Sequence, residues 1–271
     1  MKTLSRYFSM AVAYLKFNIQ AGLEYPAYLI GWFLSNPLQF IFGVITIKVV
    51  ITNFQPLGGW TFGQVVFLYG LGILSHGLSV VFFVQTWNMD RRVTEGGFDR
   101  MLVRPLNVFF QFCFDYFNYI GFTDLIPGLI VFGYGCTLVG FSFTVLNIFK
   151  ILIVVIGGTL LRGGLYIITG SLSFWVQRTG GELVDVQLSL HEATKRFPMS
   201  IYPKFLQGIF TFLWPIGFTC FYPASEFLGI ETQFVFPGSL CVWAFVVGIA
   251  IFLLGITIFN FGLLKYESAG S

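Results

Sequence analysis

Among the ionisable side chains in the strongly apolar stretches of the sequence, His76, Asp124 and Arg162 lie well inside their stretches rather than near an end. A charge in hydrocarbon costs roughly 3 kcal/mol even on mild scales, so such residues pair with one another or line a polar pathway. An ion pair between Arg162 and Asp124 would neutralise both charges. In the alternative, Arg162 faces a polar pathway and binds an anionic group of a substrate. His76 is more typical of a hydrogen-bonded packing residue than of a proton carrier.

The sequence contains no residue pattern that is typical of an enzyme or a metal site. Neither HExxH nor GxSxG occurs, and the two histidines, His76 and His191, lie in different segments. The four cysteines fall within or beside apolar runs without metal-ligand spacing, as packing residues do. There is no G-x-x-x-x-G-K-[ST] motif either, so we expect a partner to bind ATP if this chain uses it.

The segment 87–107 carries an apolar stripe at helical spacing. Phe98, Met101 and Leu102 recur on one side, charged residues surround them, and Pro105 ends the piece. We expect a short amphipathic helix there. A solvated connection is the alternative, but a mere connection needs no apolar stripe framed by charges, whereas a helix that docks into a groove of another protein does.

The elements that position these residues must be embedded in lipid. Of the 271 residues, 56% are hydrophobic and only 10% are charged, and the mean hydropathy is +0.81. A soluble domain carries about 25% charged residues, so membrane lipid is the solvent for most of this chain. Its long uninterrupted apolar runs favour helices over the alternating strands of an outer-membrane barrel. The net charge of +3 includes no basic run that indicates nucleic acid.

Six apolar runs are long enough to cross a hydrocarbon core of about 30 Å. They cover about residues 27–51, 62–86, 110–138, 146–176, 203–223 and 235–263. Before these runs, residues 1–26 place apolar side chains on one helix face and polar side chains on the other. This pattern suits an amphipathic helix in the membrane interface, and an ordinary cytoplasmic helix is the alternative. We therefore expect one all-α polytopic membrane domain over residues 1–271.

Basic residues divide the connections into two classes. Residues 52–61 and 139–145 carry none, and residues 224–234 carry only acids. Lys and Arg gather instead near both termini and in the connections 88–108 and 177–202. By the positive-inside rule, we expect both termini and these two longer loops in the cytoplasm.

Glycine recurs every seven residues in the second and sixth runs. Seven residues are close to two helical turns, so each set forms a stripe where a neighbouring backbone can approach closely. We predict two helix-packing seams, formed by Gly63, Gly70 and Gly77 and by Gly248, Gly255 and Gly262. Pro127-Gly128 and Pro215 are predicted to bend the third and fifth runs.

Several pieces of the chain, in this order, carry a resemblance to a known family. They are Glu95-Gly-Gly-Phe-Asp-Arg-Met-Leu-Val-Arg-Pro-Leu-Asn107, Phe174-Trp175, residues 196–203, residues 214–218 and residues 221–229. With six spans around them, these pieces resemble the permease subunits of ATP-binding-cassette exporters of the type 2 membrane family. The chain is most similar to a subgroup often encoded as paired permeases beside one ATPase gene.

The resemblance implies a half-transporter with an interfacial N-terminal helix and a coupling helix after the second span. ATP and Mg²⁺ would be bound by an ATPase subunit, and a second permease, identical or paralogous, would complete the pathway in the plasma (inner) membrane of a prokaryotic cell. The family's coupling element matches Glu95, Gly97, Phe98, Asp99, Arg100, Met101 and Arg104. The alternative is an ATP-independent secondary transporter or channel, a class that often has repeated halves and several polar residues at mid-depth. This sequence shows neither feature clearly.

Overall fold

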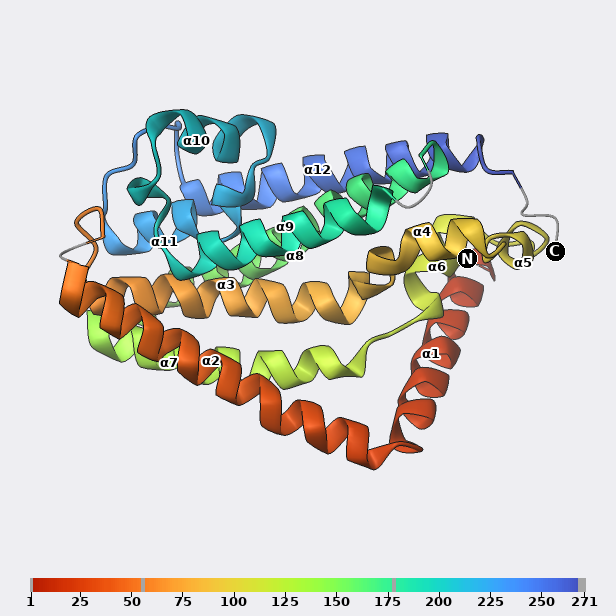
Figure 1. The fold of residues 1–271 in the computed structure, drawn as a ribbon, viewed down its shortest axis with the longest axis horizontal. Helices are drawn as coiled ribbons and strands as arrows, with labels where there is room; N and C mark the ends of the chain where they lie inside the picture. The colour runs from red at the N-terminus through yellow and green to blue at the C-terminus, as the bar shows by residue number, and fades with distance from the viewer. Residues whose placement is uncertain (1, 55–56, 177–178, 268–271) are drawn as a thin grey trace.

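The computed structural model describes residues 2–54, 57–176 and 179–267, and its regular elements in these ranges are helices. Five of these helices are long and apolar enough to cross a membrane. A helix satisfies its own backbone hydrogen bonds, which hydrocarbon cannot do. The prediction of an all-α polytopic membrane protein is confirmed. The five helices are α2 (Pro26–Phe54), α3 (Phe62–Phe83), α7 (Phe122–Val139), α8 (Val145–Ser171) and α12 (Leu240–Leu263), and they run along the long axis of the molecule (Figure 1).

Local sequence signals set several helix ends. Thr61 begins α3 with a capping box, in which its backbone N–H donates to the side chain of Gln64 at 2.8 Å. Thr144 caps α8 by accepting from the backbone N–H of Asn147 at 3.2 Å. Gly140 ends α7 with a φ of 63°, a left-handed conformation that glycine adopts without strain.

The glycine stripe of α3 faces α7. Gly70 lies against the backbone of Phe132, and a Cβ on Gly77 would come within 2.9 Å of the Leu125 side chain. Gly63 lies beside Leu138, in the last turn of α7. Because none of these glycines carries a side chain, the two helices approach closely along their whole shared length.

The glycine stripe of α12 faces α8 in the same manner. Gly248 lies against the carbonyl oxygen of Gly157, and a Cβ on Gly255 would come within 2.9 Å of the carbonyl oxygen of Gly164. Gly262 contacts the segment directly after α8. Here glycine faces glycine, so both helices contribute to the close approach.

The fifth apolar run does not form a continuous span, contrary to the prediction. It contains α10 (Lys204–Gly208), the π-helical segment η5 (Ile209–Leu213), the 3₁₀ helix η6 (Ile216–Thr219) and the first turn of α11 (Phe221–Leu228). Pro215 lacks a backbone N–H and separates η5 from η6, so the helix breaks there rather than bending. These short helices cluster at the end of the bundle that holds the connection from α2 to α3 (Figure 1).

The sixth traverse of the bundle is α9 (Thr179–Arg196), which we expected to be a cytoplasmic loop. Its first turn lies beside α4, where a Cβ on Gly181 would come within 2.9 Å of the Asp90 carboxylate. Four residues beyond its end, Ser200 contacts Gly58 in the connection between α2 and α3. An 18-residue helix is about 27 Å long, so the segment passes from one end of the bundle to the other. Residues 179–196 of the predicted cytoplasmic loop over 177–202 therefore form a helix that packs along the bundle.

The third apolar run is also interrupted, though not at its proline. Residues 108–115 form α6 (Val108–Asp115), an extended stretch follows, and η2 (Tyr119–Gly121) leads into α7. Pro127 lies inside α7, which continues past it to Val139. The predicted bend at Pro127-Gly128 therefore does not end or divide the helix.

Most of the remaining elements gather at the other end of the bundle, namely α1 (Lys2–Leu23), η1 (Val84–Asn88), α4 (Met89–Thr94), α5 (Asp99–Leu102) and η3 (Leu172–Phe174). The 3₁₀ helix η4 (Met199–Ile201) lies beside the connection from α2 to α3, where Ser200 contacts Gly58. Helix α1 lies across the direction of the bundle and packs on α6 through Tyr7 and Phe110, whose ring centroids are 4.7 Å apart (Figure 1). The start of α1 and the end of α12 lie at this same end, which agrees with an even number of traverses.

Candidate functional site

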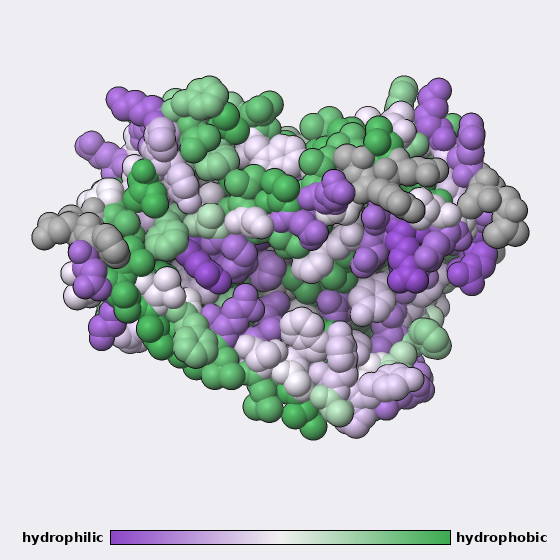
Figure 2. Space-filling model, in the orientation of Figure 1, coloured by the Kyte–Doolittle hydropathy of each residue, from purple (hydrophilic) through white to green (hydrophobic). Residues whose placement is uncertain are grey.

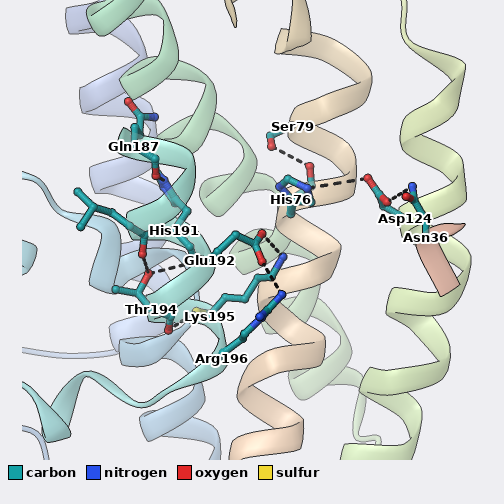
Figure 3. Close-up of polar contacts among 12 residues, drawn as sticks. Asn36, His76, Ser79, Asp124, Gln187, His191, Glu192, Thr194, Lys195 and Arg196 are labelled. Carbon is teal, nitrogen blue, oxygen red and sulfur yellow. Dashed lines mark hydrogen bonds and ion pairs between the residues drawn. The ribbon is translucent and has the colours of Figure 1, made fainter. Parts of the chain in front are cut away.

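The charged residues of α9 project into the bundle toward α3 (Figure 3). Lys195 is buried, with its side chain only 1% exposed, and its Cβ packs on Gly72 of α3. Its ammonium group lies 5.5 Å from the centre of the Phe40 ring and 5.8 Å from that of Tyr69. Two aromatic faces therefore surround a cation that has almost no access to solvent.

A single carboxylate compensates the positive charge on α9. Glu192 accepts a short hydrogen bond from Lys195, and its other oxygen lies 3.4 Å from a guanidinium nitrogen of Arg196 (Figure 3). Spacings of three and four residues place all of them on one helix face. A buried charge is tolerated only when it is paired, so Glu192 makes the passage of α9 through the bundle possible.

Asp124 of α7 has other partners than the one predicted. Asn36 of α2 donates hydrogen bonds of 2.6 Å to the Asp124 carboxylate and to Thr123, and His76 Nε2 lies 3.9 Å from the second carboxylate oxygen (Figure 3). The structure therefore does not form the predicted Arg162–Asp124 pair. Instead, Asp124, in the first turn of α7, joins this helix to α2 and α3.

Arg162 of α8 is completely buried, at 0% exposure. It interacts electrostatically with His76, His191, Glu192 and Lys195, which places it within the polar interior around α9. In the described part of the chain, it interacts with the Tyr166 hydroxyl on the same helix, and none of its three guanidinium nitrogens makes a well-aligned hydrogen bond. A buried guanidinium with so few aligned partners is costly, so Arg162 is under-satisfied in this arrangement.

Sequence reasoning found His76, Asp124 and Arg162 but missed Glu192 and Lys195. Both residues fall in the predicted connection 177–202, because residues 179–196 are too polar to be recognised as a membrane span. The available signal was its length: residues 179–196 contain no proline, and both glycines lie at the first turn. A polar helix of this length between two spans has room to traverse the bundle.

The predicted coupling segment anchors in an aromatic cluster at the end of the bundle. Phe98 is 0% exposed, and its ring lies 5.3 Å from Phe174, 5.9 Å from Phe259 and 5.8 Å from Phe112. Met101 is buried as well. The prediction that this apolar stripe docks into another protein is therefore wrong for these two residues, because they pack into the chain's own bundle.

The opposite face of the same segment is exposed. Leu102 is 48% exposed and Val103 83% exposed, and Arg100 and Arg104 are exposed beside them. A cavity of about 320 Å³ opens here, lined by Glu95, Gly97, Arg100, Met101 and Arg104 together with Arg92 and Asp115. Three guanidinium groups and two carboxylates border it, so this surface is polar and mainly basic.

Polar contacts fix the segment to its surroundings. Arg91 pairs with Glu95 at 2.8 Å, and Arg104 donates to the Tyr14 hydroxyl of α1 at 3.0 Å. The Tyr266 hydroxyl donates to Asp99 at 2.9 Å. Burial and this hydrogen bond to a carboxylate raise the pKa of Tyr266 to about 12, so the hydroxyl stays protonated and donates at neutral pH.

The turn between α4 and α5 depends on two glycines. Gly96 has a φ of 70°, which a side chain would oppose. A Cβ on Gly97 would come within 3.1 Å of the carbonyl oxygen of Arg92, so a side chain there would crowd the end of α4. The two glycines allow α5 to fold back beneath α4.

No metal centre is evident among residues 2–54, 57–176 and 179–267. No group of three or more His, Cys, Asp or Glu side chains there is arranged to hold an ion. The four cysteines are free thiols, and Cys136, Cys220 and Cys241 are buried.

Comparison with protein families gives a match that covers most of the chain. The family model described as ABC-2 family transporter protein matches residues 38–270. This range contains both the polar interior and the segment 95–104. No curated protein and no solved structure is similar enough to match the chain.

Proposed function

The chain belongs to the ABC-2 transporter family, whose members are membrane components of ABC transporters, and we propose that it is the permease subunit of an ATP-driven exporter. Because it belongs to this family and contains five helices long and apolar enough to span a membrane, it is a multi-pass membrane protein. We further place it in the plasma membrane of a prokaryotic cell, as half of a translocation pathway completed by a second permease.

The observation that carries this proposal is the anchoring of Phe98. Its ring contacts Phe259 of α12 and Phe174 directly after α8, while Leu102 and Val103 face outward. Aromatic packing is rigid, so a push on the exposed face moves the ends of two long helices together. A short helix that is exposed on one side and bound to the spans on the other suits mechanical coupling to an ATPase.

The electrostatics of the exposed face support an ATPase partner. Arg92, Arg100 and Arg104 border the cavity beside α5, and Arg100 and Arg104 are exposed. Such a surface complements acidic side chains of a docking groove. The partner would hold ATP and Mg²⁺, and closure of two ATPase subunits on ATP would shift both coupling segments and repack the spans.

The composition of α9 supports a second permease. Asp185 and Ser189 are exposed on a helix that passes through the bundle, and Glu192 is partly exposed on the same helix. A charge facing lipid at this depth is expensive, so this face is better placed along an aqueous pathway between two permeases. The pathway would then be lined by α9 of each subunit.

Charge reversal at Arg104 tests the coupling role. Arg104→Glu places a carboxylate on the basic face and is expected to reduce co-purification of the ATPase subunit at least about tenfold. Lys48→Glu is the matched control, since it makes the same charge change on an exposed residue of α2 away from α5. Equal recovery of the ATPase with both variants would refute the coupling role.

Transport by the assembled complex tests the energy source. Export should stop when the Walker lysine of the ATPase subunit is replaced, while the permease remains folded and assembled.

A secondary transporter or channel is the second candidate. The contact between His76 and Asp124 inside the bundle favours it, because buried ionisable pairs occur on proton pathways. Transport that persists without ATP and follows a proton gradient would select this candidate.

A further inference from the structure

A cavity of about 410 Å³ lies within this single chain, between α2, α3, η1 and the stretch that leads into the first turn of α7. Helix α2 diverges from α3 toward α1, which opens space at this level (Figure 1). In the space-filling view, polar and weakly polar surface lies between the apolar surface of α2 and the helices above it (Figure 2). The volume falls within the range of about 300–1,000 Å³ that is common for small-molecule sites.

Three residues that line this cavity have buried polar atoms without a hydrogen-bond partner in the described chain. They are Nε1 of Trp87, Oε1 of Gln85 and Nδ1 of His76. The amide nitrogen of Gln85 already donates to the carbonyl oxygens of Phe82 and Cys113, at 2.7 and 3.1 Å, so its oxygen is left as an acceptor. The indole N–H of Trp87 is a donor only. A ligand that reaches both groups would have to donate as well as accept, as a hydroxyl group does.

Each charged residue of the lining already has a polar partner within the chain. Arg92 pairs with Asp115 at 2.8 Å, and Lys195 pairs with Glu192. The Asp124 carboxylate is held by Asn36 and faces His76. An ionic ligand would therefore have to displace an existing partner, whereas a neutral ligand would not.

Aromatic rings form part of the wall. Tyr28 and Trp32 stand edge to face with centroids 6.2 Å apart, and Tyr116 and Trp87 also line the cavity. Such rings are apolar in body with a polar edge, which suits molecules that alternate C–H faces with hydroxyl groups. Asn36 and Asn118, also in the lining, add amide groups that both donate and accept.

We propose that this cavity binds a neutral, hydroxyl-rich ligand, namely a sugar or the sugar headgroup of a lipid. The further step, that this ligand is the substrate that the complex exports, rests on the proposed transport function. Binding itself requires neither ATP nor a second subunit. It is therefore measured on the full chain in lipid nanodiscs, with and without the ATPase partner.

The test uses tryptophan fluorescence, because Trp32 and Trp87 both line the cavity. One arm titrates free maltose, and the other incorporates a monoglucosyl diacylglycerol into the nanodisc. Tetraphenylphosphonium and a blocked, neutral dipeptide are the competing chemical classes. Saturable binding in the first arm identifies a free sugar as the ligand source, and in the second arm a lipid headgroup.

Variants assign the signal to this cavity. Trp87→Phe keeps a ring but removes the N–H donor, and Gln85→Leu removes the acceptor, so each is expected to weaken sugar binding about tenfold. Trp243→Phe on α12 is the control, since its N–H donates to Pro237 outside the cavity. If Gln85→Leu fails to fold, Trp87→Phe still decides the outcome.

Three results would overturn the inference: no sugar binding in either arm, binding of only the cation or the dipeptide, or equal affinity in Trp87→Phe and Trp243→Phe. If sugar binds but the ATPase subunit neither associates nor drives transport, the proposed function fails while the ligand site stands. If the ATPase associates and drives export but no sugar binds, the ligand assignment alone fails.

Discussion

Replacement of Glu192 by glutamine removes the carboxylate that neutralises α9. Lys195 would then be a cation only 1% exposed, beside Arg196 and within electrostatic reach of Arg162. Removal of one partner of a buried ion pair costs about 3–5 kcal/mol, because the other charge stays buried without compensation. For a chain of this size, each kcal/mol lowers the melting temperature by about 2–4 °C, so Glu192→Gln should lower it by about 6–20 °C.

The reciprocal change should cost less. Lys195→Met keeps an unbranched stem of similar length, and Glu192 would still lie 3.4 Å from Arg196 with 30% of its side chain exposed. We expect a loss of about 1–2 kcal/mol. In the double variant, Glu192→Gln no longer strands a buried cation, so its stability should resemble that of Lys195→Met alone. This corresponds to a coupling energy of about 3–5 kcal/mol, the full cost of Glu192→Gln alone.

Thermal unfolding of the full chain in lipid nanodiscs, followed by intrinsic fluorescence, measures these differences. Glu182→Gln is the matched control, because it makes the same change at an exposed position of α9 and should leave the melting temperature unchanged. The reasoning is refuted if Glu192→Gln melts within about 2 °C of the wild type, or if the double variant loses the sum of the two single effects.

Three further predictions concern helix packing and polar contacts. Gly248→Ala should destabilise the chain by about 3 kcal/mol in the same unfolding assay, because the added Cβ would meet the backbone of α8. Gly31→Ala is the control: Gly31 has open space around it, so this change should be neutral or slightly stabilising. Arg162→Leu and Asp124→Asn should have additive effects on unfolding, since the structure gives them no contact; a coupling energy above about 1 kcal/mol would contradict this arrangement. Tyr266→Phe should cost about 1–2 kcal/mol through the lost hydrogen bond to α5, and hydrogen exchange at α5 should rise; unchanged protection there would count against the anchoring role.

Residue types and run lengths determined the class of fold. The apolar runs that became α2, α3, α8 and α12 are recognisable without any neighbour, because a helix of sufficient apolar length is stable in lipid by itself. The seven-residue glycine repeats likewise marked helix faces on which a backbone could approach. The sequence also singled out residues 95–104 as an element distinct from a plain connection.

Tertiary structure decided which polar segment traverses the bundle and where each side chain points. Hydropathy counts residue types, so it could not show that α9 passes inside, where Glu192 neutralises Lys195 and Gly72 leaves room for it. Nor could the stripe containing Phe98 reveal whether it packs against its own spans or a partner, since both surfaces are apolar. Which charges pair and which surface a helix face packs against depend on residues that are distant in the chain, and only the packed bundle brings those residues together.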